Sequence, residues 1–355
     1  MKIIHIVDSL PFYVGGVSDY AYRLSSKLKN QYNIDSYFIT VKDFHNFDRS
    51  RFNNIYNIYK KKNLYQTVKQ IIDKDFNQDD KITIILEFVG YAYQKRGCPI
   101  WLLKELKKLK KSYPIHLITM FHELYAVSNN IKTSTFWLSW LQKYITKEIF
   151  FLSNSVKTNT IKYYKELKEW DNTKDIDTLP VFSNVGESLP KIEFNSRKNS
   201  VVIFGSNVSR NNVYKHKDFN QSLLDKFNIN TIIDIGSGDI VNPNLNVKFI
   251  KLGRLDIEDV EKIMLESKFG LLDYGTMPLE KSGILAAYMV HGVIPIVLSC
   301  YDKESLYIEN RHYIKAHTDI SSIDFYKMSD YIATFYIKNA SIKNHAKSYL
   351  KDIMR

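Results

Sequence analysis

Four short stretches of the chain contain residue types that can bind an anion or assist a reaction. The first holds the pair Gly15-Gly16, which follows an apolar run and precedes an amphipathic stretch. Paired glycines let the backbone approach a ligand closely, and a helix start offers unpaired N–H groups to an anion. The spacings G-x-G-x-x-G and G-x-x-x-x-G-K are absent, so a plain turn explains the pair equally well.

The second stretch, FHELYA, places His122 and Glu123 at the end of an apolar run. A histidine there can hydrogen-bond a hydroxyl group or stabilise charge that develops near a reacting carbon. A structural histidine beside a helix-capping glutamate fits the position as well. Ala126 stands where the zinc-protease pattern H-E-x-x-H needs its second histidine, and this excludes that pattern.

The third stretch, FGSNVSRNNVYKHKDF, follows an apolar run that ends at Gly205 and carries Arg210, Lys215 and Lys217. We expect a polar loop here, in which Arg210 and Lys215 bring two cations to one diphosphate group. A solvated basic loop without a ligand is the alternative.

The fourth stretch, PLEKSGILAAYMVHGVIPIV, covers residues 278–297 and predicts a helix that Ser282 caps. Glu280 could accept hydrogen bonds from hydroxyl groups of a bound sugar, and Lys281 would add positive charge. The backbone N–H groups at the helix start would receive a phosphate, namely those of Ser282, Gly283 and Ile284. A plain strand-to-helix turn is the alternative.

Apolar runs alternate with amphipathic stretches along the chain, which predicts an α/β fold with open parallel sheets. In the first part we expect strands at 3–7, 35–40, 82–89 and 115–121, and helices at 17–28, 63–76, 99–111 and 135–147. After residue 200 we expect strands at 201–206, 231–238, 247–253, 269–275, 294–299 and 312–316, and helices at 217–227, 256–267, 283–292 and twice near the C-terminus. The four stretches thus lie at carboxyl ends of strands, where such sheets bind ligands.

Two helical stretches admit a second interpretation. The basic helix at 99–111 predicts a solvated face more readily than a membrane contact. The sequence TFWLSWLQKYI has apolar residues near helical spacing, and we expect them to pack in a core, although a helix that meets a lipid-linked acceptor would look similar. These residues are Phe136, Trp137, Trp140, Leu141 and Tyr144.

The length of 355 residues favours two domains, and a polar stretch at 187–200 reads as a linker. We expect an N-terminal Rossmann-like domain at 1–186, a C-terminal nucleotide-sugar domain at 201–335, and a helix at 336–355 that packs back toward the first domain. A ligand is expected in the cleft between the domains.

The net charge of +12 favours anionic partners, but no nucleic-acid-binding signature accompanies it. The N-terminus lacks the pattern of a signal peptide, and no apolar run is long enough to span a membrane. Two distant cysteines, Cys98 and Cys300, form no metal or redox spacing. We therefore expect a cytoplasmic protein that holds no metal, and we leave peripheral contact with a membrane open.

Taken in order, these stretches resemble retaining glycosyltransferases of the GT-B fold, specifically the large family 4. The sequence SGILAAYMVHGVIPIV is similar to the family block E-x-F-G-x-x-x-x-E-A-M-A-x-G-x-P-V-V. The likeness covers nearly the whole chain, and GYAYQKRGCPIWL and LPVFSNVGE resemble a branch that assembles bacterial surface polysaccharides.

The resemblance implies a role for each candidate residue. Gly15 and Gly16 would approach the donor phosphate, and His122 would lie beside the transferred sugar. Arg210 and Lys215 would hold the diphosphate. The distal phosphate and the sugar would be bound by the turn that contains Glu280, Lys281, Ser282, Gly283 and Ile284. The base would lie beside Gly236, Gly238 and the segment Leu252 to Leu255.

The implied reaction moves a sugar from a UDP- or GDP-sugar to a glycan or a polyprenyl-diphosphate-linked acceptor, with retained configuration. Neither a metal nor another cofactor is expected, and nucleic acid is not an expected partner. The sequence departs from the family where a second glutamate binds ribose, because Ala287 or Tyr288 occupies that position. A catalytically silent partner subunit therefore stays as an alternative, and a sugar-nucleotide epimerase of the same fold is a second one.

Overall fold

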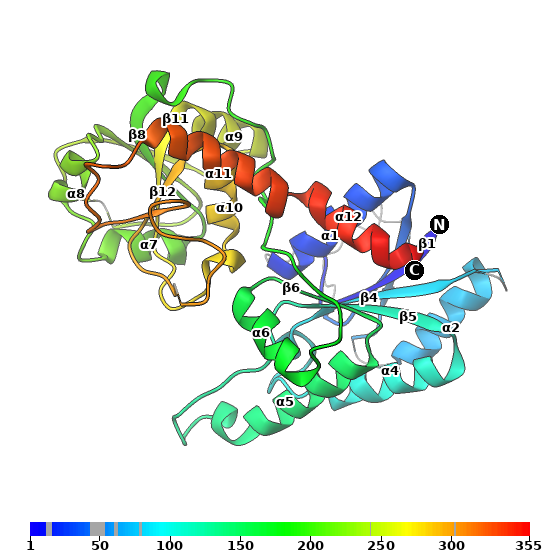
Figure 1. The fold of residues 1–355 in the computed structure, drawn as a ribbon. Coiled ribbons are helices and arrows are strands. Elements are labelled where there is room, and N and C mark those ends of the chain that lie inside the picture. The colour runs from blue at the N-terminus through cyan, green and yellow to red at the C-terminus, as the bar shows by residue number, and fades with distance from the viewer. Residues whose placement is uncertain (12–15, 43–53, 60–62, 78–79, 242, 302) are drawn as a thin grey trace. The chain divides into compact units, whose positions relative to one another are not determined.

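The computed structural model describes residues 1–11, 16–42, 54–59, 63–77, 80–241, 243–301 and 303–355 (Figure 1). The chain divides into two compact units, which we treat one at a time. Unit 1 comprises Met1–Leu179 and His345–Arg355, and unit 2 comprises Pro180–Asn344. The expected linker at 187–200 lies within unit 2 and includes a 3-10 turn, η2 (Phe194–Ser196), and the first residues of strand β8.

Unit 1 is built on a parallel sheet that has seven strands in the described part of the chain, in the order β3-β2-β1-β4-β5-β6-β7. The strands are β1 (Lys2–Val7), β2 (Asp35–Thr40), β3 (Ile55–Asn57), β4 (Ile82–Phe88), β5 (Ile115–Phe121), β6 (Ser155–Thr158) and β7 (Ile176–Thr178). The helices are α1 (Gly16–Tyr32), α2 (Leu64–Asp75), α3 (Gly90–Tyr93), α4 (Ile100–Ser112), α5 (Ser134–Leu152), α6 (Ile161–Trp170) and α12 (Ile342–Met354).

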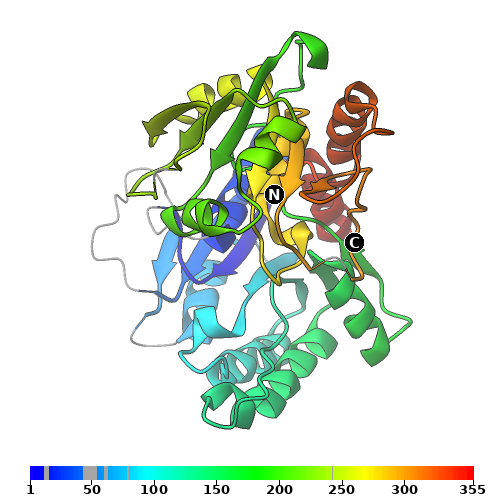
Figure 2. The ribbon, with the colours of Figure 1, turned by 90° about the vertical axis from the view of Figure 1, so that its left-hand side faces the viewer.

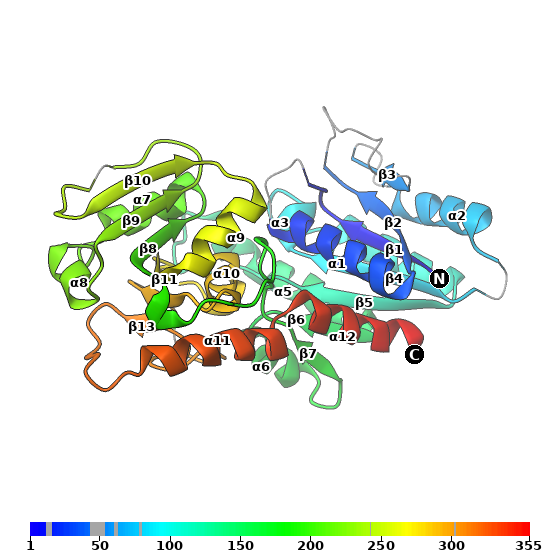
Figure 3. The same cartoon turned by 90° about the horizontal axis from the view of Figure 1, so that it is seen from above.

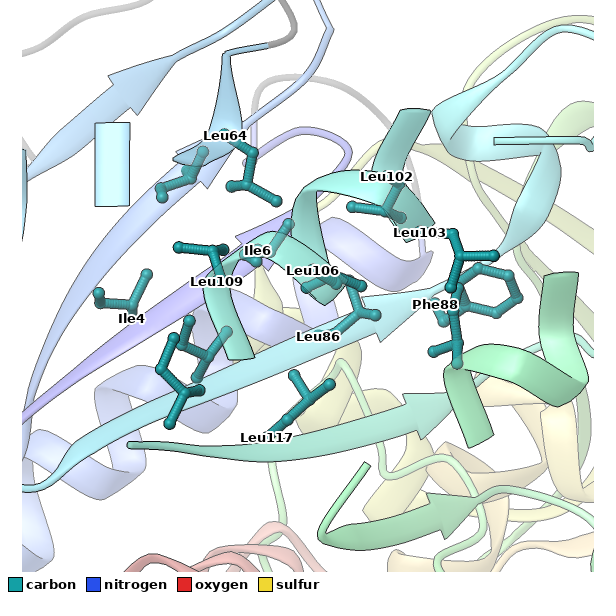
Figure 4. Close-up of a cluster of buried hydrophobic side chains, with 14 of the residues drawn as sticks. Ile4, Ile6, Leu64, Leu86, Phe88, Leu102, Leu103, Leu106, Leu109 and Leu117 are labelled. Carbon is teal, nitrogen blue, oxygen red and sulfur yellow. The ribbon is translucent and has the colours of Figure 1, made fainter. Parts of the chain in front are cut away.

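One face of this sheet carries the main hydrophobic core of unit 1. Helix α4 repeats leucine at helical spacing, so that four leucines fall on one side and lie over the strands. Figure 4 shows these side chains against Leu86 and Phe88 of β4 and Leu117 of β5. Helices α2 and α5 add further apolar side chains to the same cluster. This layer holds β4 and β5 rigidly, and their carboxyl ends carry the candidate residues of unit 1.

The opposite face of the sheet is covered by α1 and by the C-terminal helix α12, which lie alongside each other in Figures 1 and 3. The hydroxyl of Tyr20 in α1 lies 2.9 Å from Nδ1 of His345 in α12. Lys157 of β6 is fully buried, and its Nζ lies 2.7 Å from Asp352 of α12 and 2.8 Å from Asp177 of β7. Buried cations require such partners, so this pairing fixes α12 to the sheet.

Unit 2 repeats the design with a parallel sheet of six strands among its described residues, in the order β10-β9-β8-β11-β12-β13. The strands are β8 (Lys198–Phe204), β9 (Thr231–Ile235), β10 (Lys248–Gly253), β11 (Ser267–Leu272), β12 (Ile294–Val297) and β13 (Ile314–Lys315). The helices are α7 (Asn207–Lys215), α8 (Gln221–Lys226), α9 (Ile257–Glu266), α10 (Gly283–Val290) and α11 (Phe325–Asn339), together with the 3-10 turn η3 (Leu279–Lys281).

The expected polar loop after β8 is wrong, because the chain forms helix α7 there. Ser206 caps this helix, and its Oγ accepts a hydrogen bond of 3.2 Å from the N–H of Ser209. Serine and asparagine favour both turns and helix starts, and the sequence alone does not separate these outcomes. The change matters because a helix fixes the directions of Arg210 and Lys215.

The expected core packing of the aromatic residues on α5 is also wrong for three of them. Trp137, Trp140 and Tyr144 are each more than half exposed. Helix α5 instead buries Ile145, Ile149 and Phe150, and its neighbour α4 lies beside it in Figures 1 and 2. Among the described residues, no helix combines the length and the apolar character needed to cross a bilayer.

Candidate functional site

The strand order of unit 2 defines where its ligand site is expected. Strands β8 and β11 are neighbours in the sheet, and the connections from them lead to opposite sides of the order. In doubly wound sheets, ligands bind at the carboxyl ends of the strands at this switch point. The turn at Gly205 after β8 and the start of α10 after β11 both lie at this edge.

The start of helix α10 has the geometry of an anion-binding turn. Ser282 is buried and caps the helix as predicted, and its Oγ accepts a hydrogen bond of 3.1 Å from the N–H of Leu285. The N–H of Ser282 itself donates to the carbonyl of Leu279 at 2.9 Å, so it is not available to a ligand. The first-turn N–H groups that follow, those of Gly283 and Ile284, have no acceptor within a helix.

Two glycines let the backbone turns of this edge pack closely. Gly205 and Gly236 have positive φ angles of 135° and 149°. A Cβ atom at Gly205 would lie 2.7 Å from Cδ1 of Ile284, and one at Gly236 would lie 2.2 Å from the carbonyl oxygen of Gly205. The turns after β8 and β9 and the start of α10 are therefore in contact, as a site at this edge requires.

Arg210 lies inside this edge and does not present a free charge. Its side chain is fully buried and forms an ion pair with Asp234, which is also fully buried. Its Nε donates to the carbonyl of Gly205 at 3.2 Å, and its Nη2 donates to the carbonyl of Ser237. The guanidinium group thus ties together the turns that follow β8 and β9.

The expectation that one loop brings Arg210 and Lys215 together is wrong. Both residues belong to α7, and five residues correspond to a rotation of about 140° around a helix axis. Lys215 is exposed at the last position of the helix, whereas Arg210 faces the sheet. Lys281, in the turn before α10, is partly exposed.

Glu280 lies just before the candidate phosphate-binding residues and is hydrogen-bonded to two backbone N–H groups of unit 2. Its side chain is buried, and Oε1 accepts a hydrogen bond of 2.7 Å from the N–H of Leu306. Its carbonyl accepts a bond of 2.8 Å from the N–H of Val181. These bonds fix the turn η3 and so place the start of α10.

The segments expected beside a base do lie together. The N–H of Gly236 donates to the carbonyl of Gly253 at 2.8 Å, which joins the turn after β9 to the segment Leu252–Leu255. Gly238 packs against Asn207 at the start of α7, and Leu255 is partly exposed. The two turns therefore form one continuous edge beside the switch point.

The residues that stand where the family has its ribose-binding glutamate are buried inside unit 2. Ala287 and Tyr288 are both fully buried. The hydroxyl of Tyr288 lies 2.8 Å from the carbonyl of Val202 and accepts a bond of 3.3 Å from the N–H of Phe204. Tyr288 thus supports β8 from within, and its ring lies where a Cβ of Gly270 would be, which lets α10 pack close to β11.

Unit 1 contains a buried histidine–carboxylate pair at the carboxyl ends of β4 and β5. Nε2 of His122 lies 2.8 Å from Oε2 of Glu87, and both side chains are buried. Burial raises the pKa of Glu87, although the hydrogen bond and the charge of His122 act in the opposite direction. Among the described residues, Oε1 of Glu87 has no hydrogen-bond partner.

This pair extends into a cluster of rings. The ring of Tyr20 meets that of His122 edge to face at 5.0 Å, and the Tyr20 hydroxyl contacts His345. Burial raises the pKa of Tyr20 and of Tyr349 well above the ordinary value for tyrosine, so both hydroxyls stay neutral. Helix α12 thus helps to hold the ring of His122 in place through Tyr20.

Sequence reasoning missed Glu87 and Asp234, although a signal for both was present. Each is a lone carboxylate near the carboxyl end of a strand whose other residues are almost all apolar, in ILEF and IIDIG. Such a residue is costly to bury and therefore indicates a partner or a function. Asp8, which follows β1, is a third buried acid at a strand end, and Lys42 is its partner.

The remaining candidates lie at the start of α1. Gly16 is the first residue of this helix, and a Cβ atom there would meet nothing within 4 Å. Gly15 lies outside the described residues. Among the described residues, no group of three histidine, cysteine, aspartate or glutamate side chains is arranged to hold a metal ion.

A surface hollow of about 470 Å³ lies away from these edges. Its lining includes Phe194, Phe227, Lys268 and Phe325. Lys268 is the second residue of β11, so the hollow is at the opposite end of the strands from the start of α10. Its two lysines, Lys226 and Lys268, are already bonded to protein oxygens. We therefore place the candidate site at the carboxyl edges and not in this hollow.

Comparison with known proteins gives a fold and no sequence family. No protein-family model matches the chain, and no curated protein sequence matches it significantly. Solved structures do match over its full length. An alpha-glucosyltransferase in complex with UDP and a 13-mer DNA has a TM-score of 0.59 and 13% identity, with 100% of each chain covered.

Two further structures agree with this match. The sucrose-phosphate synthase of Thermosynechococcus elongatus has a TM-score of 0.65 and 10% identity, with 99% of this chain and 98% of that chain covered. TarM has a TM-score of 0.59 and 12% identity, with the same coverage. Together with the two parallel sheets, these matches establish the fold. The chain has the GT-B fold, as its sequence predicted.

Proposed function

We propose that the chain is a glycosyltransferase that takes its sugar from a nucleoside-diphosphate sugar. The observation that carries this proposal is the turn at the start of α10, beside the glycine turns after β8 and β9 in a sheet of Rossmann order. The GT-B fold supports it, and structures that resemble the chain are alpha-glucosyltransferases in complex with UDP or UDP-glucose.

The first-turn N–H groups of α10 would bind the distal phosphate of the donor. The positive end of the helix dipole favours an anion there, and negative charge grows on the diphosphate as the sugar leaves. Gly283 and Ile284 would therefore stabilise the leaving group more strongly in the transition state than in the ground state. Lys215 and Lys281 are proposed to add positive charge, and Gly16 to leave room for the phosphate.

Arg210 is proposed to support this site from within. Its ion pair with Asp234 and its bonds to Gly205 and Ser237 hold the two turns that would face the diphosphate. Direct contact with the donor would require these bonds to break. Glu280 would bind sugar hydroxyls at the same turn, and Gly236, Gly238 and Leu255 would flank the base.

His122 is proposed to lie beside the transferred sugar, with Glu87 holding its ring. A carboxylate that accepts a hydrogen bond from Nε2 selects the tautomer of a neutral histidine and orients its ring. The reaction would retain configuration, proceed without a metal, and use a UDP- or GDP-sugar. A glycan or a polyprenyl-diphosphate-linked acceptor, in the synthesis of a bacterial surface polysaccharide, is the acceptor that the sequence resemblance favours.

The acceptor is proposed from the sequence resemblance alone. One similar structure carries DNA with a modified base, so the expectation that nucleic acid is not a partner stays a prediction. The buried Ala287 and Tyr288 support the alternative of a silent partner subunit, because ribose would need other contacts than the family glutamate.

A panel of nucleoside diphosphates and nucleotide sugars tests the proposal by thermal shift, followed by hydrolysis of each donor without acceptor. We expect one donor to raise the melting temperature and to be hydrolysed slowly. His122→Ala should leave nucleotide binding near the wild-type value and lower hydrolysis at least tenfold. Binding without hydrolysis or transfer would favour the silent subunit, interconversion of two donors would favour an epimerase, and no binding at all would contradict the proposal.

A further inference from the structure

Helix α5 and the loop before it expose a group of large apolar side chains, which we call the α5 surface. Trp137, Trp140 and Tyr144 are 65%, 68% and 51% exposed. Soluble proteins leave single apolar residues in water, but a cluster of them marks an interaction site. The α5 surface consists of Val127, Ile131, Trp137, Trp140, Tyr144 and Phe151, all of them exposed.

The spacing of these residues places them on one face of the helix. Positions 137, 140, 144 and 151 are separated by three, four and seven residues, which is the repeat of a helical stripe. The opposite face is already occupied by the core of unit 1, through Ile145, Ile149 and Phe150. The stripe therefore has no place in the core of unit 1.

The start of this surface is held in a defined conformation. Thr133 caps α5, and its Oγ1 accepts a hydrogen bond of 3.3 Å from the N–H of Phe136. Nε1 of Trp137 donates to the carbonyl of Ile131 at 2.9 Å, which fixes the indole against the preceding loop. The aromatic side chains thus project from an ordered helix.

Lysines lie beside the α5 surface. Lys143 and Lys147 lie on α5 along one border of the stripe, and Lys132 lies in the loop before it, all three exposed. The neighbouring helix α4 carries further exposed lysines, of which Lys107 reaches α5 and Lys108 lies over the ring of Tyr65 on α2. Glu148 on α5 is paired with Lys107, and Glu166 lies 3.8 Å from Lys143.

We propose that the α5 surface docks unit 1 on an anionic lipid bilayer. Tryptophan and tyrosine favour the boundary between lipid and water because their rings are apolar and carry one polar group. Lysines beside them are attracted to acidic headgroups, and together these features define an interfacial helix. The inference does not depend on the proposed reaction, because docking can be measured without a donor.

Two other partners fit these observations less well. A protein surface that binds duplex DNA has basic and polar groups at its centre, whereas aromatic and aliphatic side chains occupy the centre here. In a symmetric dimer through this stripe, Lys143 and Lys147 would face their own copies, and like charges would oppose association.

Flotation with vesicles tests the proposal on the full chain. One set contains phosphatidylcholine alone, and the other contains about one third phosphatidylglycerol, so that surface charge is the difference between them. We expect binding to the anionic vesicles, a shift of tryptophan emission to shorter wavelength, and a loss of binding at high salt. Trp140→Ser with Tyr144→Ser should reduce the bound fraction at least tenfold, and Lys143→Gln with Lys147→Gln should reduce it several-fold.

Matched variants in unit 2 control for the loss of apolar surface and of charge. Val208→Ser removes another exposed apolar side chain, and Lys262→Gln with Lys338→Gln removes two other exposed lysines. Both should bind vesicles like the wild type. The proposal is overturned if the chain ignores anionic vesicles, if it binds neutral vesicles equally, or if the α5 variants abolish binding to duplex DNA or self-association and leave vesicle binding unchanged.

Discussion

A buried carboxylate near the end of a strand is the most informative single residue in each unit. Glu87 in unit 1 contacts His122, and Asp234 in unit 2 contacts Arg210 and Tyr214. Each acid holds one residue that sequence reasoning had selected. Their residue types are enough to select His122 and Arg210 as candidates, and the lone carboxylates in ILEF and IIDIG are the sequence signal for the partners that orient them.

Replacement of Glu87 tests whether burial raises the pKa of its carboxyl group. Because burial raises its pKa above the ordinary value of 4.5, the ionised form is less favourable in the folded state than in the unfolded state. The contribution of Glu87 to the stability of unit 1 should therefore fall as pH rises from 4.5 through the raised pKa. Glutamine does not titrate, so the free energy of unfolding of Glu87→Gln, relative to that of the wild type, should increase over that pH range. Urea unfolding between pH 4 and pH 8 measures the difference, with the exposed Glu258→Gln as control. A difference that is independent of pH would contradict the assignment.

Single residues also show where sequence reasoning stops. Ser282 was predicted as a cap because serine before an apolar helix satisfies free N–H groups, and this rule depends on nearby residues only. The inward direction of Arg210 depends on Asp234, which lies 24 residues further along the chain. Such contacts between distant segments leave no local pattern in one sequence.

At the scale of elements, long apolar strands and periodic helices were predictable, and short polar elements were not. The strand ITIILEF and the helix at 100–112 have strong periodicity and were both anticipated. Helix α7 was expected as a loop, since its sequence NVSRNNVYK is mostly polar and has few strong helix formers. Its stability therefore depends on its cap and on its packing against β8 and β11.

Removal of the cap of α7 tests this account. Ser206→Ala deletes the oxygen that accepts from the N–H of Ser209, and such a loss costs about 1 kcal/mol. We expect a lower free energy of unfolding for unit 2 and weaker donor binding, because α7 carries Arg210 to the two turns. Chemical unfolding and nucleotide titration measure the two effects. Ser206→Asp, which can also cap the helix, should restore stability, and equal effects of both variants would argue against the cap.

At the scale of the whole molecule, each unit contains a buried histidine that is unfavourable at low pH. Burial lowers the pKa of His5 in unit 1 from 6.5 to about 3 and that of His312 in unit 2 to about 4. The unfolded chain binds these protons first, so the contribution of each histidine to the stability of its unit should fall as pH decreases from 6.5 toward these values. Protonation of His5 should therefore destabilise unit 1, and protonation of His312 should destabilise unit 2.

His5→Leu tests the acid dependence in unit 1. Neither ring nitrogen of His5 has a hydrogen-bond partner among the described residues, so leucine removes two buried polar atoms and one proton site. We expect unit 1 to gain stability at neutral pH and to lose less of it between pH 6.5 and pH 4. Thermal unfolding across this range measures the change. The exposed His317→Leu is the control, and equal acid sensitivity of His5→Leu and the wild type would contradict the prediction.

The α/β class with parallel sheets could be predicted because apolar strands alternate with amphipathic helices along the chain. The exposed aromatic stripe of α5 could not, since a buried stripe and an exposed one have the same spacing in sequence. The fold then places the glycine turns after β8 and β9 and the start of α10 at one edge of unit 2. The central claim is that this edge binds the diphosphate of a nucleotide sugar.

Calorimetric titration of UDP and GDP into the wild type and Gly283→Asp tests this claim most directly. Gly283 is the first residue of α10, and a Cβ atom there lies 3.8 Å from the nearest atom of Asn184, an ordinary contact. A carboxylate at a helix start stabilises the helix but repels a phosphate. We predict that the wild type binds one of the nucleotides, and that Gly283→Asp keeps its melting temperature and binds at least tenfold more weakly. Ser134→Asp, which adds the same charge at the start of α5, should bind like the wild type. Unchanged binding by Gly283→Asp, or no binding of either nucleotide by the wild type, would contradict the account.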